Sequence, residues 1–189
     1  LREISIPYVA DSSQLFARIA HEEWAVYLDS GKPHGQYGHY DIIAGRPFVT
    51  LVTRNGETVV QQASRGAYKT RQDPFETLKE VMAPFINLDS PSKALAQPWP
   101  FHGGAIGYFS YDLGRYLEKL PTSAESKEEI PDMCIGIYDW AVLVDHRLKT
   151  ASLISYGRDP ATEAGWDDLC ALFTSAVVPI NADFRVMSE

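Results

Sequence analysis

The sequence has little cysteine, and no cysteines stand at metal-binding spacing. Cys134 and Cys170 are its only two thiols, and five histidines are scattered along the 189 residues. The lack of a CxxC motif argues against a zinc site. Because both cysteines lie among apolar residues, we expect two buried free thiols in a cytoplasmic protein. A disulfide between them stays open on sequence grounds.

Long apolar runs and basic clusters are also missing. No run reaches the roughly 18 apolar residues of a membrane-spanning helix. The opening LREISIPYVA lacks the order of a signal peptide. The net charge is −8, and no stretch of Lys and Arg could follow a phosphate backbone. We therefore expect no nucleic-acid or membrane partner and a cytoplasmic location.

What is present is typical of one globular domain with a dense core. Hydrophobic residues make up 45% of the chain, aromatic residues 12% and charged residues 22%. Apolar patterns bounded by turn residues predict strands, which we place at 4–9, 24–30, 40–45, 47–54, 57–62, 65–70, 133–146 and 149–157, with a further strand within GGAIGYFSYD. The strand at 133–146 is apolar at odd and even positions, which indicates a central strand covered on both faces.

Turn and cap residues divide these strands from four predicted helices. Asn55-Gly56 is typical of a type I′ hairpin. Asp11 with Gln14 resembles a capping box for a helix to about His21, and Asp73-Pro74 opens a second helix. Asp159-Pro160 opens the last one. Because the strands cluster in hairpins, the expected fold class is α+β, with mostly antiparallel sheets and packed helices.

The stretch FHGGAIGYFSYDLGRYLEKLP at 101–121 concentrates four glycines. His102–Gly104 is similar to the HGGG oxyanion loop of esterases, but no G-x-S-x-G elbow accompanies it. The glycine spacing does not fit a phosphate loop, and a Walker lysine is missing. We therefore expect scaffold: glycines in a strand that packs closely, then a short helix capped by Asp112 and ended by Pro121.

Carboxylates follow that stretch. Asp112, Glu118 and the acids of 125–129 could suggest a catalytic pair. A solvated loop is the favoured interpretation of 125–129, because its acids stand beside Ser and Lys in a segment without apolar periodicity.

The loop at 31–40, GKPHGQYGHY, is rich in glycine and aromatic residues. Its glycines would let the chain wrap around something small. Ser30, Tyr37, His39 and Tyr40 offer hydrogen bonds and stacking surfaces. A ligand-binding loop and a plain surface loop are both open on these grounds.

Three blocks resemble the chorismate-utilising enzymes, the component I chains of anthranilate synthase and of aminodeoxychorismate synthase. They are the stretch at 101–121, the block IPDMCIGIYDWAVLVDHRLKTASLIS at 130–155, and WAVYLDSG with the following YDI. The second and third are similar to the aminodeoxychorismate synthase branch. The resemblance covers nearly the whole chain, in order.

The resemblance implies that residues 1–189 form the N-terminal domain of a longer enzyme. The family's C-terminal chorismate-binding domain carries the P-I-K-G-T and G-S-I-T-G-A-P-K blocks and the carboxylates that hold Mg²⁺; none of these is in the sequence. The resemblance therefore implies no catalytic residue and no metal ligand in this chain. The whole enzyme would replace the 4-hydroxyl of chorismate with ammonia from a glutamine amidotransferase partner.

The resemblance also implies a pocket for L-tryptophan in this domain. The matching positions are Leu28, Ser30, Tyr37, Gly38, His39, Tyr40 and Asp41. Tyr37 and Tyr40 would flank the indole, and Ser30 would bond the amino or carboxylate group. Gly38-His39 stand where relatives often have Ser-Arg, so an arginine clamp for the carboxylate is missing.

Two other functions are weighed against this one. Anthranilate synthase component I usually carries L-L-E-S where this chain has Tyr27-Leu28-Asp29-Ser30. A stand-alone amino-acid-binding regulatory module is the second alternative.

Overall fold

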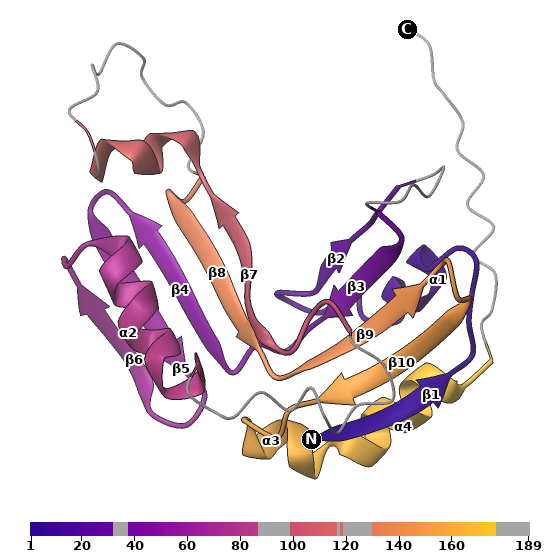
Figure 1. Ribbon diagram of the computed structural model, residues 1–189. Helices are drawn as coiled ribbons and strands as arrows, with labels where there is room; N and C mark the ends of the chain where they lie inside the picture. Colours follow the sequence, from indigo (N-terminus) through magenta and orange to yellow (C-terminus); the bar gives the residue numbers. More distant parts are fainter. Residues whose placement is uncertain (32–37, 87–98, 117, 119–129, 177–189) are drawn as a thin grey trace, which may run out of the picture.

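The computed structural model describes residues 1–31, 38–86, 99–116, 118 and 130–176. Within them, ten strands form two antiparallel five-stranded sheets that open like a V in Figure 1. The predicted α+β class is confirmed. The loop 87–98, Pro121, most of 122–132 and the chain after 176 lie outside the described residues, so the predicted stop at Pro121 is not tested.

One sheet, sheet A, has the strand order β1-β10-β9-β3-β2. Its strands are β1 (Arg2–Ile6), β2 (Val26–Leu28), β3 (Tyr40–Ala44), β9 (Trp140–Asp145) and β10 (Thr150–Ser155). Side chains alternate across it as strand geometry requires. One face packs against α1 (Ser13–Phe16) and α4 (Trp166–Thr174), around buried Trp140 and Phe173. The other face turns toward the second sheet (Figure 1).

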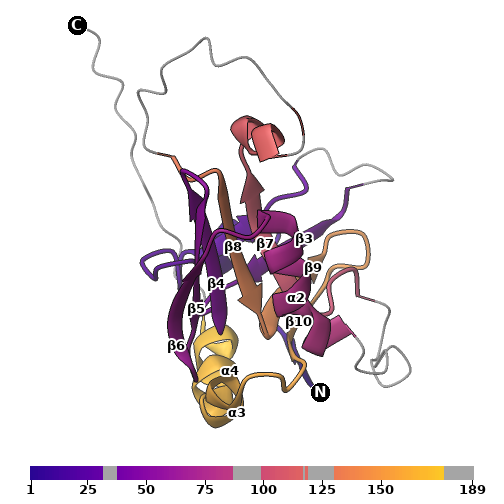
Figure 2. The same cartoon turned by 90° about the vertical axis from the view of Figure 1, so that its left-hand side faces the viewer.

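The second sheet, sheet B, has the order β6-β5-β4-β8-β7. Its strands are β4 (Val49–Arg54), β5 (Glu57–Gln62), β6 (Gly66–Thr70), β7 (Gly104–Phe109) and β8 (Met133–Tyr138). Helix α2 (Pro74–Ile86) covers its outer face with Phe75, Leu78, Val81 and Met82, as predicted. Figure 2 shows this helix to one side of the sheet.

The single central strand predicted at 133–146 is wrong. The chain runs through β8 in sheet B, bends at Asp139 and continues as β9 in sheet A. Asp139 is buried, and its carboxylate accepts hydrogen bonds from Ser155 Oγ at 2.9 Å and Arg158 N at 2.8 Å. These bonds fix the bend. The apolar run before Asp139 therefore lies in sheet B, and the apolar run after it lies in sheet A.

The hairpin and helix predictions have mixed outcomes. Asn55 and Gly56 have φ of 49° and 77°, which confirms the left-handed turn between β4 and β5. Asp73 Oδ1 accepts from Phe75 N and Glu76 N, so the cap of α2 is also confirmed. Asp159 caps α3 (Pro160–Ala164), but Gly165 separates that helix from α4, so the single last helix is wrong.

Two other caps differ from prediction. The first helix has one turn, with Ser12 at its N-cap position and no side-chain cap bond; Asp11 instead accepts from Ser13. Asp112 lies inside a 3-10 helix, η2 (Tyr111–Tyr116), and pairs with Arg115 Nε at 2.9 Å. In both places a short polar side chain bonds to a near neighbour instead of capping a regular helix.

Candidate functional site

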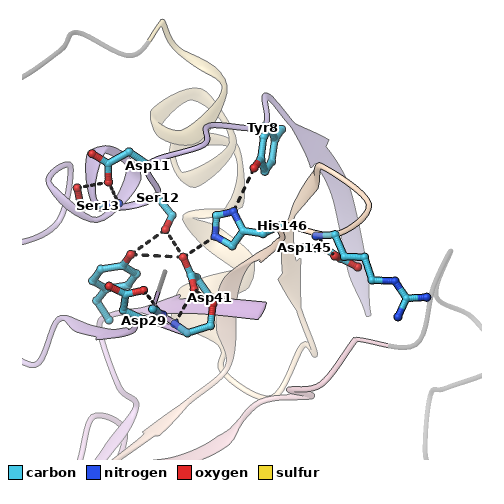
Figure 3. Close-up of polar contacts among 12 residues, drawn as sticks. Tyr8, Asp11, Ser12, Ser13, Asp29, Asp41, Asp145 and His146 are labelled. Atoms are coloured by element: carbon cyan, nitrogen blue, oxygen red, sulfur yellow. Dashed lines mark hydrogen bonds and ion pairs between the residues drawn. The ribbon is translucent and has the colours of Figure 1, made fainter. Parts of the chain in front are cut away.

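Asp41 is the centre of a buried polar network on the helix-covered face of sheet A. Figure 3 shows its carboxylate surrounded by side chains from several elements. Oδ1 accepts from Ser30 N at 2.8 Å and from Ser30 Oγ at 2.7 Å. Oδ2 accepts from Ser12 Oγ, from Tyr27 OH at 3.4 Å, and bonds to His146 Nε2 at 2.7 Å. Both carboxylate oxygens are therefore occupied.

The donors of this network decide the charge of Asp41. Only 1% of the residue's surface is exposed, and burial alone would raise the pKa of its carboxyl. Hydrogen bonds from Ser12, Ser30 and His146 outweigh burial and lower that pKa to about 2. Burial also raises the pKa of Tyr27 to about 12, so its phenol keeps its proton as a donor. Asp41 is thus an anion at neutral pH.

His146 links this carboxylate to the first segment of the chain. It follows β9, is largely buried, and its Nδ1 lies 3.1 Å from Tyr8 OH (Figure 3). Nε2 bonds to the Asp41 carboxylate and Nδ1 pairs with the Tyr8 hydroxyl, so the ring joins the two segments. The arrangement resembles the carboxylate-oriented histidine of many active sites.

A cavity of about 320 Å³ opens beside the network. It is lined by Ala10, Asp11, Ser12, Ser13, Tyr27, Asp29, Asp41 and His146. Its walls are polar and rich in carboxylates. No group of three or more His, Cys, Asp or Glu in the described part of the chain could hold a metal ion. The residues described therefore do not fit a magnesium site.

The predicted pocket residues divide between the two faces of sheet A. Asp41 points to the cavity and holds Ser30. Tyr40, the neighbour of Asp41, points to the opposite face, where its ring lies 6.2 Å from that of Trp99. Leu28 stands on the Tyr40 side, since Val26, two residues earlier, packs in the same cluster.

The remaining predicted residues belong to the loop before β3. The rings of His39 and Tyr40 lie 4.1 Å apart, and His39 O accepts from His146 N. A side chain at Gly38 would lie 3.2 Å from Ser30 O, so glycine suits that close approach. Tyr37 lies outside the described residues. The described end of this loop is thus tied to the buried network.

Four members of the network were not predicted as site residues: Tyr8, Ser12, Tyr27 and His146. They come from three separate segments, and only the fold brings them to Asp41. The position of Asp41 did indicate a buried polar contact, because a lone acid between apolar neighbours in a strand needs hydrogen-bond partners when it is buried. That signal does not say which donors supply them.

Close packing is confirmed for Gly103 and Gly107 of the 101–121 stretch, but not for Gly104, where a Cβ would meet only Met82 Cε at 3.8 Å and the φ of 131° is what suits glycine. A Cβ on Gly107 would lie 2.0 Å from Cys134 O of β8 and 2.8 Å from Ile135 Cα. Gly103 has φ of 70°, and a Cβ there would lie 3.3 Å from the Tyr156 ring. Cys134 and Cys170 are both free thiols, but each is half-buried instead of buried. Burial still raises the pKa of both thiols.

None of the described helices is long and apolar enough to cross a membrane.

The fold has a counterpart among solved structures. The crystal structure of anthranilate synthase component I from Streptococcus pneumoniae TIGR4 matches 75% of this chain with a TM-score of 0.54. The match covers 32% of that chain at 23% sequence identity, which defines a shared fold and no more. The two sheets therefore have the architecture of a component I chain.

The family follows from the sequence comparison. The profile of the chorismate binding enzyme family matches residues 24–178, and the chain belongs to that family. Aminodeoxychorismate synthase component 1 of Escherichia coli (strain K12) is 41% identical over 141 residues, which cover 75% of this chain and 30% of that protein.

Two further relatives show how sequence identity varies within the family. The Salmonella typhimurium aminodeoxychorismate synthase component 1 is 38% identical over 98% of this chain and 38% of its own length. Anthranilate synthase component 1 of Acetivibrio thermocellus is 27% identical over 74% of this chain and 27% of its length. The chain thus spans about a third of the length of these relatives.

Proposed function

We propose that this chain is the N-terminal domain of an aminodeoxychorismate synthase component 1. Identity to relatives of that name is 36–41%, against 27–30% for the anthranilate synthases. This difference in sequence identity is the observation that favours aminodeoxychorismate synthase over anthranilate synthase. Tyr27-Leu28-Asp29-Ser30 supports it, because β2 has no L-L-E-S sequence.

The activity belongs to the longer protein. Chorismate and ammonia would be converted to 4-amino-4-deoxychorismate, with ammonia supplied by a glutamine amidotransferase partner. Mg²⁺ would be held by the C-terminal chorismate-binding portion, because the described residues offer no ligand set. The role of the domain itself is to support that portion and to carry a regulatory pocket.

The test is an assay of the complete gene product with chorismate, Mg²⁺ and ammonium. We expect 4-amino-4-deoxychorismate, identified by mass spectrometry, and no turnover by residues 1–189 alone. Anthranilate, which is fluorescent, as the main product would refute this assignment. Turnover by the 189-residue chain would refute the division of labour between the two portions.

For the pocket, we propose that L-tryptophan binds where β2 ends and β3 begins, with Tyr40 on one face of sheet A and Ser30, held by Asp41, on the other. The candidate residues are Leu28, Ser30, Tyr37, Gly38, His39 and Tyr40, with Asp41 as the support of Ser30. The Asp41 carboxylate already accepts the Ser30 hydroxyl proton, which leaves Ser30 Oγ as an acceptor for the ligand's ammonium. Half-buried Tyr40 offers a ring face to the indole.

Calorimetry tests the pocket. L-tryptophan is titrated into the 189-residue chain and into the complete gene product, with Tyr40→Ala as the variant and Tyr68→Ala on β6 as the control. We expect binding that Tyr40→Ala weakens at least tenfold and Tyr68→Ala leaves unchanged. Binding by both forms without chorismate turnover in either would favour the stand-alone regulatory module. No heat at millimolar tryptophan would rule out the pocket.

A further inference from the structure

The edge strands of the two sheets differ in charge. β1 and β6 carry charged residues that form ion pairs: Arg2 with Glu163, and Lys69 with Glu57 at 2.7 Å. Natural sheets use charges on edge strands to prevent further pairing. The other two edges, β2 with sequence VYL and β7 with sequence GAIGYF, contain no charged residue and no proline. These two edges have no such protection against another strand.

The unprotected edges border one apolar cluster. Ile106 of β7 and Val26 of β2 both pack in the cluster between the sheets, around Trp99 and Leu143. Because side chains alternate along a strand, Tyr108 and Leu28 stand on the same faces, two residues further along. They are 40% and 46% exposed. The inter-sheet cluster therefore continues past its buried part into apolar side chains that no described residue fully covers.

Figure 1 shows where the two edge strands lie. β7 and β2 face each other across the opening of the V, and the 3-10 helix η2 stands at the end of β7. Tyr111, at the start of η2, is 92% exposed and adds a second aromatic ring near the end of β7. We define the open surface as Leu28, Tyr108 and Tyr111 with the edge of β7 that pairs with no described strand. An exposed surface of this kind marks an interaction site.

We propose that the open surface is where the C-terminal portion of the longer protein docks, adding a strand to the free edge of β7. The inference rests on the proposed function. The length of the relatives indicates which segment would bind to this surface. The match covers 98% of this chain but 38% of the Salmonella typhimurium protein, so most of that relative lies outside the match. A second copy is disfavoured, since two chains of charge −8 repel.

Amide hydrogen exchange on residues 104–109 tests this docking. We expect these amides to exchange at least tenfold more slowly in the complete gene product than in the 189-residue chain. The variant Tyr108→Glu should remove that protection and leave the melting temperature of the 189-residue chain unchanged, because its side chain is exposed there. The matched control is Tyr68→Glu, a tyrosine 48% exposed on the charged edge β6 of the same sheet.

The outcomes separate this inference from the proposed function. Equal exchange in both forms, or loss of protection by Tyr68→Glu as well, would overturn the docking surface. A gene product that ends at Glu189, or a dimer of residues 1–189 that Tyr108→Glu dissociates in sedimentation, would overturn the occupant. An anthranilate product with β7 protected would overturn the proposed function and support the surface.

Discussion

The two sheets have the same strand number and opposite characters. Sheet A is covered on both faces: β9 is buried at all six positions, and a charged network lies under its helix-covered face. Sheet B is covered by α2 on one face, and β4 alternates between buried and partly exposed positions. Sheet A thus buries a charged network under its helices, whereas sheet B is built on apolar packing and ends at β7 in partly exposed aromatic side chains.

This difference assigns different tasks to the two halves. A buried anion such as Asp41 is tolerated only when all its partners are in place, so sheet A fixes one geometry for the loop before β3. Sheet B relies on apolar packing, which is less directional and can be extended by another apolar surface. Stability changes in each half should therefore respond to different perturbations.

The largest expected effect is at Gly107, in the close contact of β7 with β8. Gly107→Ala places a methyl group against Cys134 O and Ile135 Cα, which are backbone atoms and cannot turn aside. We expect a loss of about 3 kcal/mol or more in the free energy of unfolding, measured by urea denaturation. Gly165→Ala is the control, because the nearest atom lies at 3.4 Å. A loss under about 1 kcal/mol at Gly107 would contradict the close packing assigned to β7.

Asp41→Asn probes the charged half. The amide keeps the volume but cannot accept at both ends, so one donor among Ser12, Ser30 and His146 loses its acceptor. The expected loss is about 2–3 kcal/mol. Asp29→Asn, at the rim of the same cavity, keeps its acceptor for Gly31 N and should cost under about 0.5 kcal/mol. Equal losses in the two variants would show that burial of the charge does not matter.

The stability difference between wild type and Asp41→Asn should depend on pH. The pKa of Asp41 falls from an ordinary 3.8 to about 2 in the folded protein. The stability this provides, about 2 kcal/mol, is complete above pH 5 and is lost as the pH falls through 4 toward 2. The gap between wild type and Asp41→Asn should therefore narrow over that range in acid denaturation. A gap that stays constant down to pH 2 would be inconsistent with the lowered pKa.

The smallest effect is expected at the far end of the network. Tyr8→Phe removes the hydroxyl next to His146 Nδ1 and leaves the ring in place. We expect a loss of about 1 kcal/mol by thermal unfolding. Tyr111→Phe, at a side chain almost fully exposed, provides the baseline near zero. If both changes are neutral, Tyr8 is not part of the energetics of the network.

The sequence predicted local structure where one or two residues decide it. Asn55-Gly56 and Asp73-Pro74 fix their turn and cap through backbone preferences that do not depend on the rest of the fold. Sequence patterns failed at Asp139, because an apolar run indicates burial and not which sheet provides it. They failed also at Asp112, where a local ion pair with Arg115 competes with the cap.

The candidate site was predicted in part for a related reason. Ser30 and Asp41 stand near each other in sequence, and the fold joins them through two hydrogen bonds. The division of Tyr40 and Asp41 between opposite faces follows from strand alternation, once the strand is placed. His146 comes from 105 residues away along the chain, and no local pattern connects it with Asp41.

The pairing of β1 with β10 sets an order for the appearance of the fold during synthesis. Arg2 lies opposite Ser155, so β1 pairs only with a strand that emerges about 150 residues later. β4, β5 and β6 can meanwhile pair in sequence as two adjoining hairpins. Sheet B can therefore begin to assemble early on the ribosome, while sheet A must wait. A nascent chain halted before residue 150 would expose REISI as an unpaired strand for a chaperone to hold.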